Sequence, residues 1–231
     1  MFMETGTQTA SDWTYMLQRE AHALIEELDV HPEAQRLFDG SIDAESYATW
    51  LAQTYHYVRW TQPLLAQAGR RMKRIGKYPA LAGLLLQKSS EEQGHEQWLL
   101  ADLKSLGWTR ERVERVQLRP AVAAYVAWNR FTAESHAPAA FLGTAYVLEY
   151  LSVHRAELAA EQLITRAAIP HIQQAVSFLR GHAGADGDHV DGLLSVLRPL
   201  TDRQEQTAIL LSAHTTRALY LGLFSEEAPL G

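Results

Sequence analysis

The chain has 231 residues, of which 47% are hydrophobic, and a formal net charge of −6. This length supports one domain with a buried core, and the acidic balance argues against electrostatic binding of DNA or RNA. Cysteine is absent, which excludes disulfides, zinc–thiolate sites, iron–sulfur clusters and a cysteine nucleophile. The metal ligands that remain are His, Asp and Glu, a set that suits non-haem iron or manganese better than copper.

The first ten residues, MFMETGTQTA, lack the apolar stretch of a signal peptide, and we expect residues 1–10 to form a flexible tail. No apolar run approaches the roughly 18 residues that a membrane-spanning helix needs. We therefore expect a cytoplasmic chain without a membrane partner and without a nucleic-acid partner. One helical domain is expected over residues 11–225.

Helical periodicity continues through most of the chain, and no alternating strand pattern persists. The predicted helices cover residues 12–29, 32–38, 43–76, 79–106, 120–135, 141–163, 170–182, 188–197 and 202–224. Most Gly and Pro residues fall between these segments, and no internal repeat or linker interrupts them. An all-α fold, arranged as a single helical bundle, is the simplest architecture that fits this pattern.

The polar run QKSSEEQGHEQ lies within the predicted helix 79–106. Glu92 and His95 are three residues apart, so on a helix their side chains share one face. Glu91 lies four residues before His95 and shares that face too, which leaves the choice between the two acids open. A Glu-x-x-His pair is what a di-iron carboxylate site takes from each half of a bundle. By itself, the pair fits a solvated polar face better than a metal site.

Glu149 is the only acid in the apolar stretch from Ala137 to Val153. An ionised carboxylate in such surroundings is costly unless it is paired or bound to metal. Glu149 is therefore a candidate ligand, and the alternatives are that it faces a rim or pairs with a basic side chain elsewhere in the fold.

The segment RGHAGADGDHV contains His182, Asp186 and His189 at spacings of four and three. On a helix these three side chains lie on one face. Two imidazoles and a carboxylate on one stripe can hold a divalent metal ion. Three glycines in the segment weaken a continuous helix, and the alternative is a polar loop.

With these motifs in place, the chain resembles the haem-oxygenase-like di-iron oxidases and oxygenases, which are iron-containing redox enzymes. The resemblance extends from the first predicted helix to Phe224 and rests on three motifs in order. They are Glu92-x-x-His95, Glu149 in YVLE, and His182-x-x-x-Asp186-x-x-His189. Some members place the first carboxylate seven residues before the first histidine. That position is Lys88 here, so this chain departs from their pattern and must use Glu92 or Glu91.

The resemblance implies a helical bundle around a site of three histidines and three carboxylates. Its metal ligands would be Glu92, His95, Glu149, His182, Asp186 and His189. It further implies two Fe(II) ions per chain, bridged by Glu149 as the catalytic carboxylate, and O₂ as co-substrate. The substrate would be a small organic molecule, either amino-acid-derived or a fatty acid. We also expect a homodimer, and an external electron donor would serve this chemistry.

Two alternatives stay open. A haem oxygenase carries an axial histidine on its first helix, and His22 in LQREAHALIEEL occupies such a place. That alternative leaves the residues His182, Asp186 and His189 without a function, and it ranks second. The other alternative is a non-catalytic interaction domain with a degenerate metal site. A thiaminase of the TenA type is excluded, because it needs a cysteine nucleophile.

Overall fold

The structure, a computed structural model, describes residues 8–183 and 187–224. Within these residues it contains helices and connecting loops and no strand, which confirms the all-α prediction. The helices are α1 (Gln8–Val30), α2 (Pro32–Phe38), α3 (Ala44–Ile75), α4 (Pro79–Glu91), α5 (His95–Ser105), α6 (Arg110–Glu114), α7 (Pro120–Glu134), α8 (Phe141–Arg166), α9 (Ser177–Ala183), α10 (Gly187–Leu197) and α11 (Arg203–Leu221), with 3₁₀ turns η1 (Pro138–Ala140) and η2 (Ile172–Gln174).

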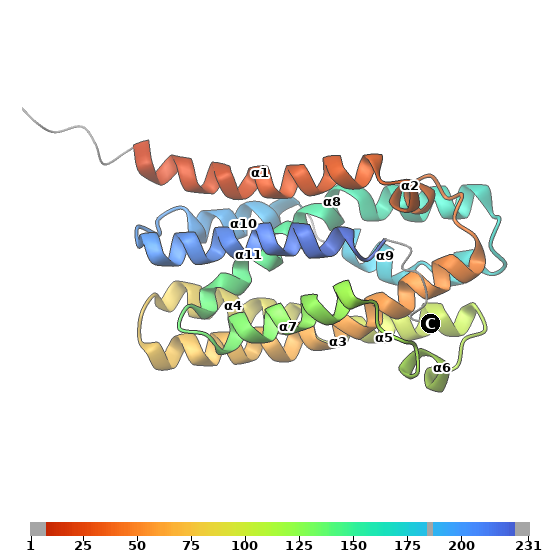
Figure 1. The fold of residues 1–231 in the computed structure, drawn as a ribbon, viewed down its shortest axis with the longest axis horizontal. Helices are drawn as coiled ribbons and strands as arrows, with labels where there is room; N and C mark the ends of the chain where they lie inside the picture. Colours follow the sequence, from red (N-terminus) through yellow and green to blue (C-terminus); the bar gives the residue numbers. More distant parts are fainter. Residues whose placement is uncertain (1–7, 184–186, 225–231) are drawn as a thin grey trace, which may run out of the picture.

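The long helices run along the long axis of one bundle (Figure 1). Helices α3, α4 and α7 form one side, while α1, α8, α10 and α11 form the other. One continuous set of buried side chains joins the two sides, from Leu17 on α1 to Leu65 on α3 and Ile209 on α11. Because burial of these apolar surfaces stabilises both sides together, the described residues form a single helical domain.

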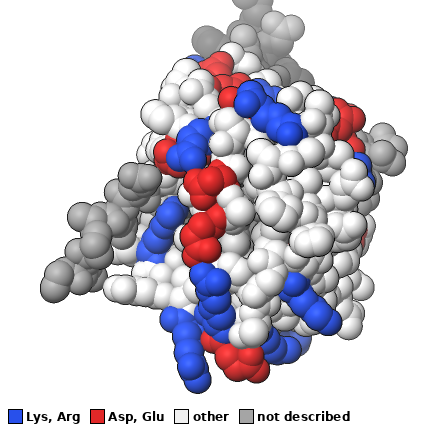
Figure 2. Space-filling model, turned by 90° about the vertical axis from the view of Figure 1, so that its right-hand side faces the viewer, with Lys and Arg blue, Asp and Glu red and all other residues white. Residues whose placement is uncertain are grey.

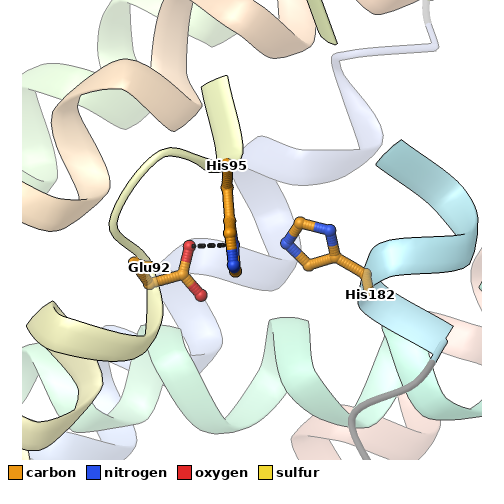
Figure 3. Close-up of side chains that lie close together, drawn as sticks. All are labelled: Glu92, His95 and His182. Atoms are coloured by element: carbon orange, nitrogen blue, oxygen red, sulfur yellow. Dashed lines mark hydrogen bonds and ion pairs between the residues drawn. The ribbon is translucent and has the colours of Figure 1, made fainter. Parts of the chain in front are cut away.

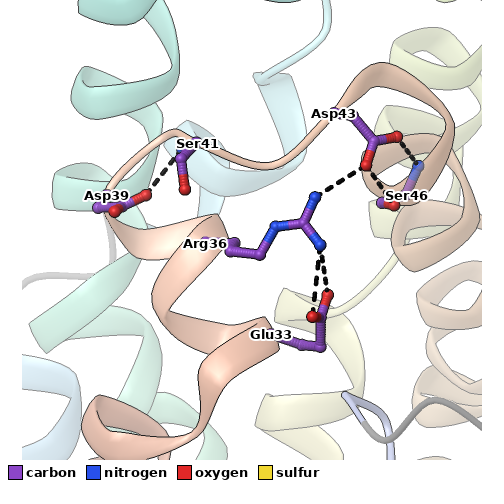
Figure 4. A network of polar contacts seen from close by, with 6 residues as sticks. All are labelled: Glu33, Arg36, Asp39, Ser41, Asp43 and Ser46. Atoms are coloured by element: carbon purple, nitrogen blue, oxygen red, sulfur yellow. Dashed lines mark hydrogen bonds and ion pairs between the residues drawn. The ribbon is translucent and has the colours of Figure 1, made fainter.

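A polar network joins α2 to the start of α3 (Figure 4). The Asp43 carboxylate accepts a hydrogen bond of 2.9 Å from the Ser46 backbone N–H and so caps the N-terminus of α3. The Arg36 guanidinium donates to Asp43 at 2.9 Å and also pairs with Glu33. These contacts explain why a 32-residue helix starts here, directly after a short turn.

The predicted helix 79–106 is wrong as one helix. The chain breaks between Glu91 and His95, which separates α4 from α5. Gly94 takes φ +89°, a left-handed conformation that favours glycine because other residues carry a Cβ. As a consequence Glu92 is the C-cap residue of α4, and His95 is the first residue of α5.

The predicted helix 170–182 is wrong over its first seven residues, because only α9 (Ser177–Ala183) is α-helical there and the 3₁₀ turn η2 (Ile172–Gln174) precedes it. Other boundaries differ less. Helix α1 starts at Gln8, within the expected tail, and residues 1–7 lie outside the described part of the chain. The five-residue helix α6 was not predicted, because one turn is too short to show a period. The last helix ends at Leu221 rather than near Phe224.

Acidic and basic side chains stand side by side on the end of the bundle formed by α2, α6 and the end of α8 (Figure 2). Ion pairs at this end include Arg36–Asp43 at 2.9 Å, Arg112–Glu45 at 2.6 Å and Arg166–Asp39 at 3.7 Å. This face therefore carries charges of both signs rather than one basic surface. Among the described residues, no helix is long and apolar enough to span a membrane.

Candidate metal centre

Three predicted ligands meet at one point of the bundle (Figure 3). Glu92, His95 and His182 each offer a ligand atom, and these atoms all lie within 4.8 Å of one another. Glu92 Oε2 is 3.1 Å from His95 Nδ1, and the two imidazole centroids are 4.7 Å apart at an angle of 74°. We call Glu92, His95 and His182 the triad.

His182 is positioned by α5, the helix that begins with His95. Asp102 on α5 is fully buried and accepts hydrogen bonds of 2.9 Å from the backbone N–H groups of Ser177 and Phe178. It also accepts from the Ser177 hydroxyl, so it caps the N-terminus of α9. Helix α9 carries His182 five residues later, and Asp102 thereby links His182 to α5.

The His182 ring is held in one tautomer. Its Nδ1 lies 3.0 Å from the Phe178 carbonyl oxygen, which can only accept, so Nδ1 carries the proton and Nε2 keeps its lone pair. Burial lowers the pKa of His182, which favours the neutral ring that a metal ion requires. A hydrogen bond of this kind is the usual support of a metal-binding imidazole.

Trp98 on α5 packs against both histidines of the triad. Its ring stacks on His95 with centroids 4.2 Å apart and meets His182 edge-on at 5.7 Å. A Cβ on Gly181 would lie 2.4 Å from the Trp98 ring, so only glycine leaves room for the indole there. The sequence indicated merely that Gly181 weakens a helix; the structure gives it a packing role.

Glu149 on α8 lines the same cavity as the triad and forms an ion pair there. Its Oε1 lies 2.5 Å from Lys88 Nζ, which also lies 2.8 Å from Glu91 Oε2. Burial raises the pKa of Glu149, and the Lys88 ammonium opposes that rise. Burial alone would lower the pKa of Lys88, but the two carboxylates outweigh it and raise that pKa. Glu149 Oε2 is buried and has no hydrogen-bond partner among the described residues.

The predicted ligands therefore divide into three groups. Glu92 contacts His95, whereas Glu91 pairs with Lys88, which favours Glu92 as the first carboxylate. Glu149 pairs with a basic side chain, one of the alternatives left open, and still has a second oxygen. Asp186 and the side chain of His189 lie outside the described part of the structure, so their ligand role stays a prediction. Helix α9 ends at Ala183 and α10 begins at Gly187, so His182 and His189 belong to different helices.

A cavity of about 380 Å³ extends from the triad into the bundle. The acidic and basic residues in its lining are Lys88, Glu91, Glu149, Arg155 and the triad. The rest of the lining is mostly apolar and aromatic, including Trp50, Tyr57, Leu148, Phe178 and Tyr220. Trp50 and Tyr57 belong to the buried core as well as to this lining. In the sequence, Lys88 stood out only as the position where some members of the resembled family place the first carboxylate, and its part in the cavity was missed.

His22 lies elsewhere. It is exposed on α1, its ring is 3.0 Å from the Tyr150 hydroxyl, and it is absent from the residues that line the cavity. A haem in this cavity would therefore lack the axial ligand that the haem-oxygenase alternative requires.

The chain belongs to the family of iron-containing redox enzymes, whose family model matches residues 48–221. That span includes the triad, Lys88 and Glu149. Solved structures share the fold. A domain of unknown function with a haem-oxygenase-like fold from Shewanella denitrificans OS217 has a TM-score of 0.78 at 22% identity, covering 92% of this chain and 90% of its own. A TenA homologue from Pseudomonas syringae pv. tomato DC3000 has a TM-score of 0.75 at 18% identity, covering 96% of each chain.

A TenA homologue from P. horikoshii OT3 has a TM-score of 0.64 at 17% identity, covering 92% of this chain and 96% of its own. At such identities the likeness shows the haem-oxygenase-like fold alone. No curated protein matches the chain. The residues present fit the iron that the family name implies, because the triad brings two imidazoles and a carboxylate within reach of one ion. The buried, unpartnered Oε2 of Glu149 offers a further oxygen ligand.

Proposed function

We propose that this protein is a non-haem iron oxidase or oxygenase that uses O₂ to oxidise a small organic substrate. The observation that carries the proposal is the convergence of Glu92, His95 and His182 in the lining of a largely apolar cavity. Iron held there would supply the redox chemistry and the activation of O₂. Membership of the iron-containing redox enzymes supports the same conclusion.

In this proposal the chain's own residues orient the triad histidines and shield the site from water. The Phe178 carbonyl fixes the tautomer of His182, and Trp98 fixes the plane of His95. The aromatic walls exclude water from the space beside the ligands, which protects the site from side reactions. A largely apolar cavity whose lining includes a few charged groups suits a substrate with an apolar body, whether amino-acid-derived or a fatty acid.

We propose two Fe(II) ions per chain, with Glu149 as the shared carboxylate and with Asp186 and His189 as ligands of the second ion. The buried oxygen of Glu149 supports the first of these assignments. The cytoplasmic location, the homodimer and the external electron donor stay predictions from the sequence. A purely structural helical domain is less well supported, because burying a carboxylate oxygen without a partner is costly and serves no packing purpose.

The test is iron binding without oxygen. After loading with Fe(II) and desalting, the wild-type chain should retain iron, and His182→Ala should lose most of it because one imidazole of the triad is gone. His154→Ala is the matched control, since His154 is an exposed histidine that packs on Tyr150. Iron content is measured by mass spectrometry of the metal, and O₂ uptake by an electrode.

Retention of full iron by the His182→Ala variant would overturn the assignment of the triad. Added haem distinguishes the alternative function. We expect no stoichiometric Soret band, and a band that disappears in His22→Ala would favour a haem oxygenase instead.

A further inference from the structure

The feature that the proposed function leaves unused is a buried ammonium in the lining of the cavity. The Lys88 side chain is only 5% exposed and points between two carboxylates, with Nζ at 2.5 Å from Glu149 Oε1 and 2.8 Å from Glu91 Oε2. A lysine so deeply buried is uncommon unless paired, and here one cation serves two acids. The positive charge that neutralises Glu149 is thus already supplied by the chain.

This ammonium lies beside the oxygen of Glu149 that a metal ion could still bind. One oxygen of Glu149 is occupied by Lys88, and the other, Oε2, is buried and unpartnered. A divalent ion on Oε2 would come within a few ångströms of the ammonium, in surroundings that water screens poorly, and like charges at that range repel strongly. The triad is different, because Lys88 makes no contact with Glu92, His95 or His182 among its hydrogen bonds and ion pairs.

We infer that Lys88 is an internal cation that competes with the second metal ion for Glu149. The triad then fills first, and Glu149 accepts metal only when Lys88 gives way. The inference rests on the proposed function, since it needs iron in the triad. On this inference, Lys88 determines the order in which the triad and Glu149 take up metal, a role that a merely structural ion pair would not have.

The two roles predict different results for a neutral replacement. If Lys88 only stabilises the fold, Lys88→Met lowers the melting temperature and leaves metal affinities unchanged. If Lys88 competes with metal, the same change removes the competitor and leaves Glu149 without its ammonium partner. A second metal ion then binds more tightly, while binding at the triad changes little.

The experiment is anaerobic equilibrium dialysis of the metal-free, full-length chain against Fe(II) over a range of free concentrations. We expect wild type to bind in two steps, and the second dissociation constant of Lys88→Met to fall at least about tenfold, since a full like charge is removed at short range. Lys88→Arg keeps the cation and should stay near wild type. Lys104→Met, on the exposed surface of α5, is the control for removing a lysine.

Each outcome decides one point. An unchanged second step in Lys88→Met, or an equal gain in Lys88→Arg, overturns the competition. Absence of iron binding in wild type and in Lys88→Met alike means that the proposed function has failed. Circular dichroism checks folding, and Lys88→Gln repeats the test if the Met variant does not fold.

Discussion

Individual side chains at the candidate metal centre are fixed by packing as much as by hydrogen bonds. Trp98 contacts both imidazoles of the triad and lies against Gly181, one residue before His182. The indole therefore transmits any change at Gly181 directly to His95 and His182. In this way a residue without a side chain helps to position the two histidines of the triad.

Replacing Gly181 with Ala should lower the free energy of unfolding by about 1–3 kcal/mol, the usual cost of overpacking. Its Cβ would lie 2.4 Å from the indole, which cannot bend away as a flexible side chain would. Iron retention should fall as well. Urea denaturation and metal analysis measure the two effects.

Gly83→Ala is the control, because that position on α4 has open space and should gain up to about 1 kcal/mol of stability from helix propensity. Wild-type stability and iron content in Gly181→Ala would contradict this role.

The helices depend on their ends. Helix α3 begins at the Asp43 cap and α9 at the Asp102 cap, and both caps are carboxylates that accept backbone N–H groups. The cap of α9 comes from a residue 75 positions earlier in the chain. A long-range cap of this kind positions His182 without appearing in any local sequence pattern.

The cap of α3 predicts a pH dependence. The Ser46 backbone N–H, the Ser46 hydroxyl and Arg36 lower the pKa of Asp43. The folded chain therefore binds this proton more weakly than the unfolded chain does, so the stabilisation is complete above the unfolded pKa of about 3.9 and is lost as the pH falls through the folded pKa. Asp43→Ala should cost about 1 kcal/mol at pH 7, a value typical of N-caps.

Urea denaturation of wild type and Asp43→Ala between pH 7 and pH 3 measures this difference, which should shrink toward the acid end. Asp43→Asn is the matched control, because Asn caps without a charge and should keep a nearly constant difference from Asp43→Ala. A gap between wild type and Asp43→Ala that is independent of pH would contradict the assignment.

At the scale of the whole molecule, the bundle depends on a close approach of α8 and α11. A Cβ on Gly143 of α8 would lie 2.1 Å from the Ile209 carbonyl oxygen of α11. Next to this contact the hydroxyl of Thr144 lies 3.0 Å from that of Ser212 and 2.7 Å from that of Thr216. These contacts draw together the two helices that complete one side of the bundle.

Gly143→Ala should destabilise the protein by about 3 kcal/mol, at the upper end of overpacking costs, because the opposing atom belongs to the backbone and cannot rotate away. Thermal unfolding followed by circular dichroism gives the change. Gly192→Ala on α10 has open space around its Cβ and should unfold at or above the wild-type temperature. Equal melting temperatures for the two variants would show that α8 and α11 can separate at no cost.

Much of this architecture could be predicted from periodicity. The helices around Glu149 and around residues 43–76 are long and amphipathic or apolar, and their apolar faces determine the bundle. The break at Gly94 was missed because glycine is tolerated inside helices, and only its left-handed φ shows that it ends one. The pairing of Glu149 with Lys88 spans 61 residues, and one sequence offers no means of selecting that lysine from the others.

The gap between α4 and α5 affects how this protein could change over evolutionary time. Glu92 lies in the short turn between α4 and α5 rather than inside a continuous helix. Turns tolerate substitutions and changes of length better than packed helices do. A first carboxylate placed there can be exchanged or moved without disturbing the apolar layers on either side. The bundle and its ligand set can therefore diverge at different rates, and a scaffold of this kind can be adapted to new chemistry while its interior stays the same.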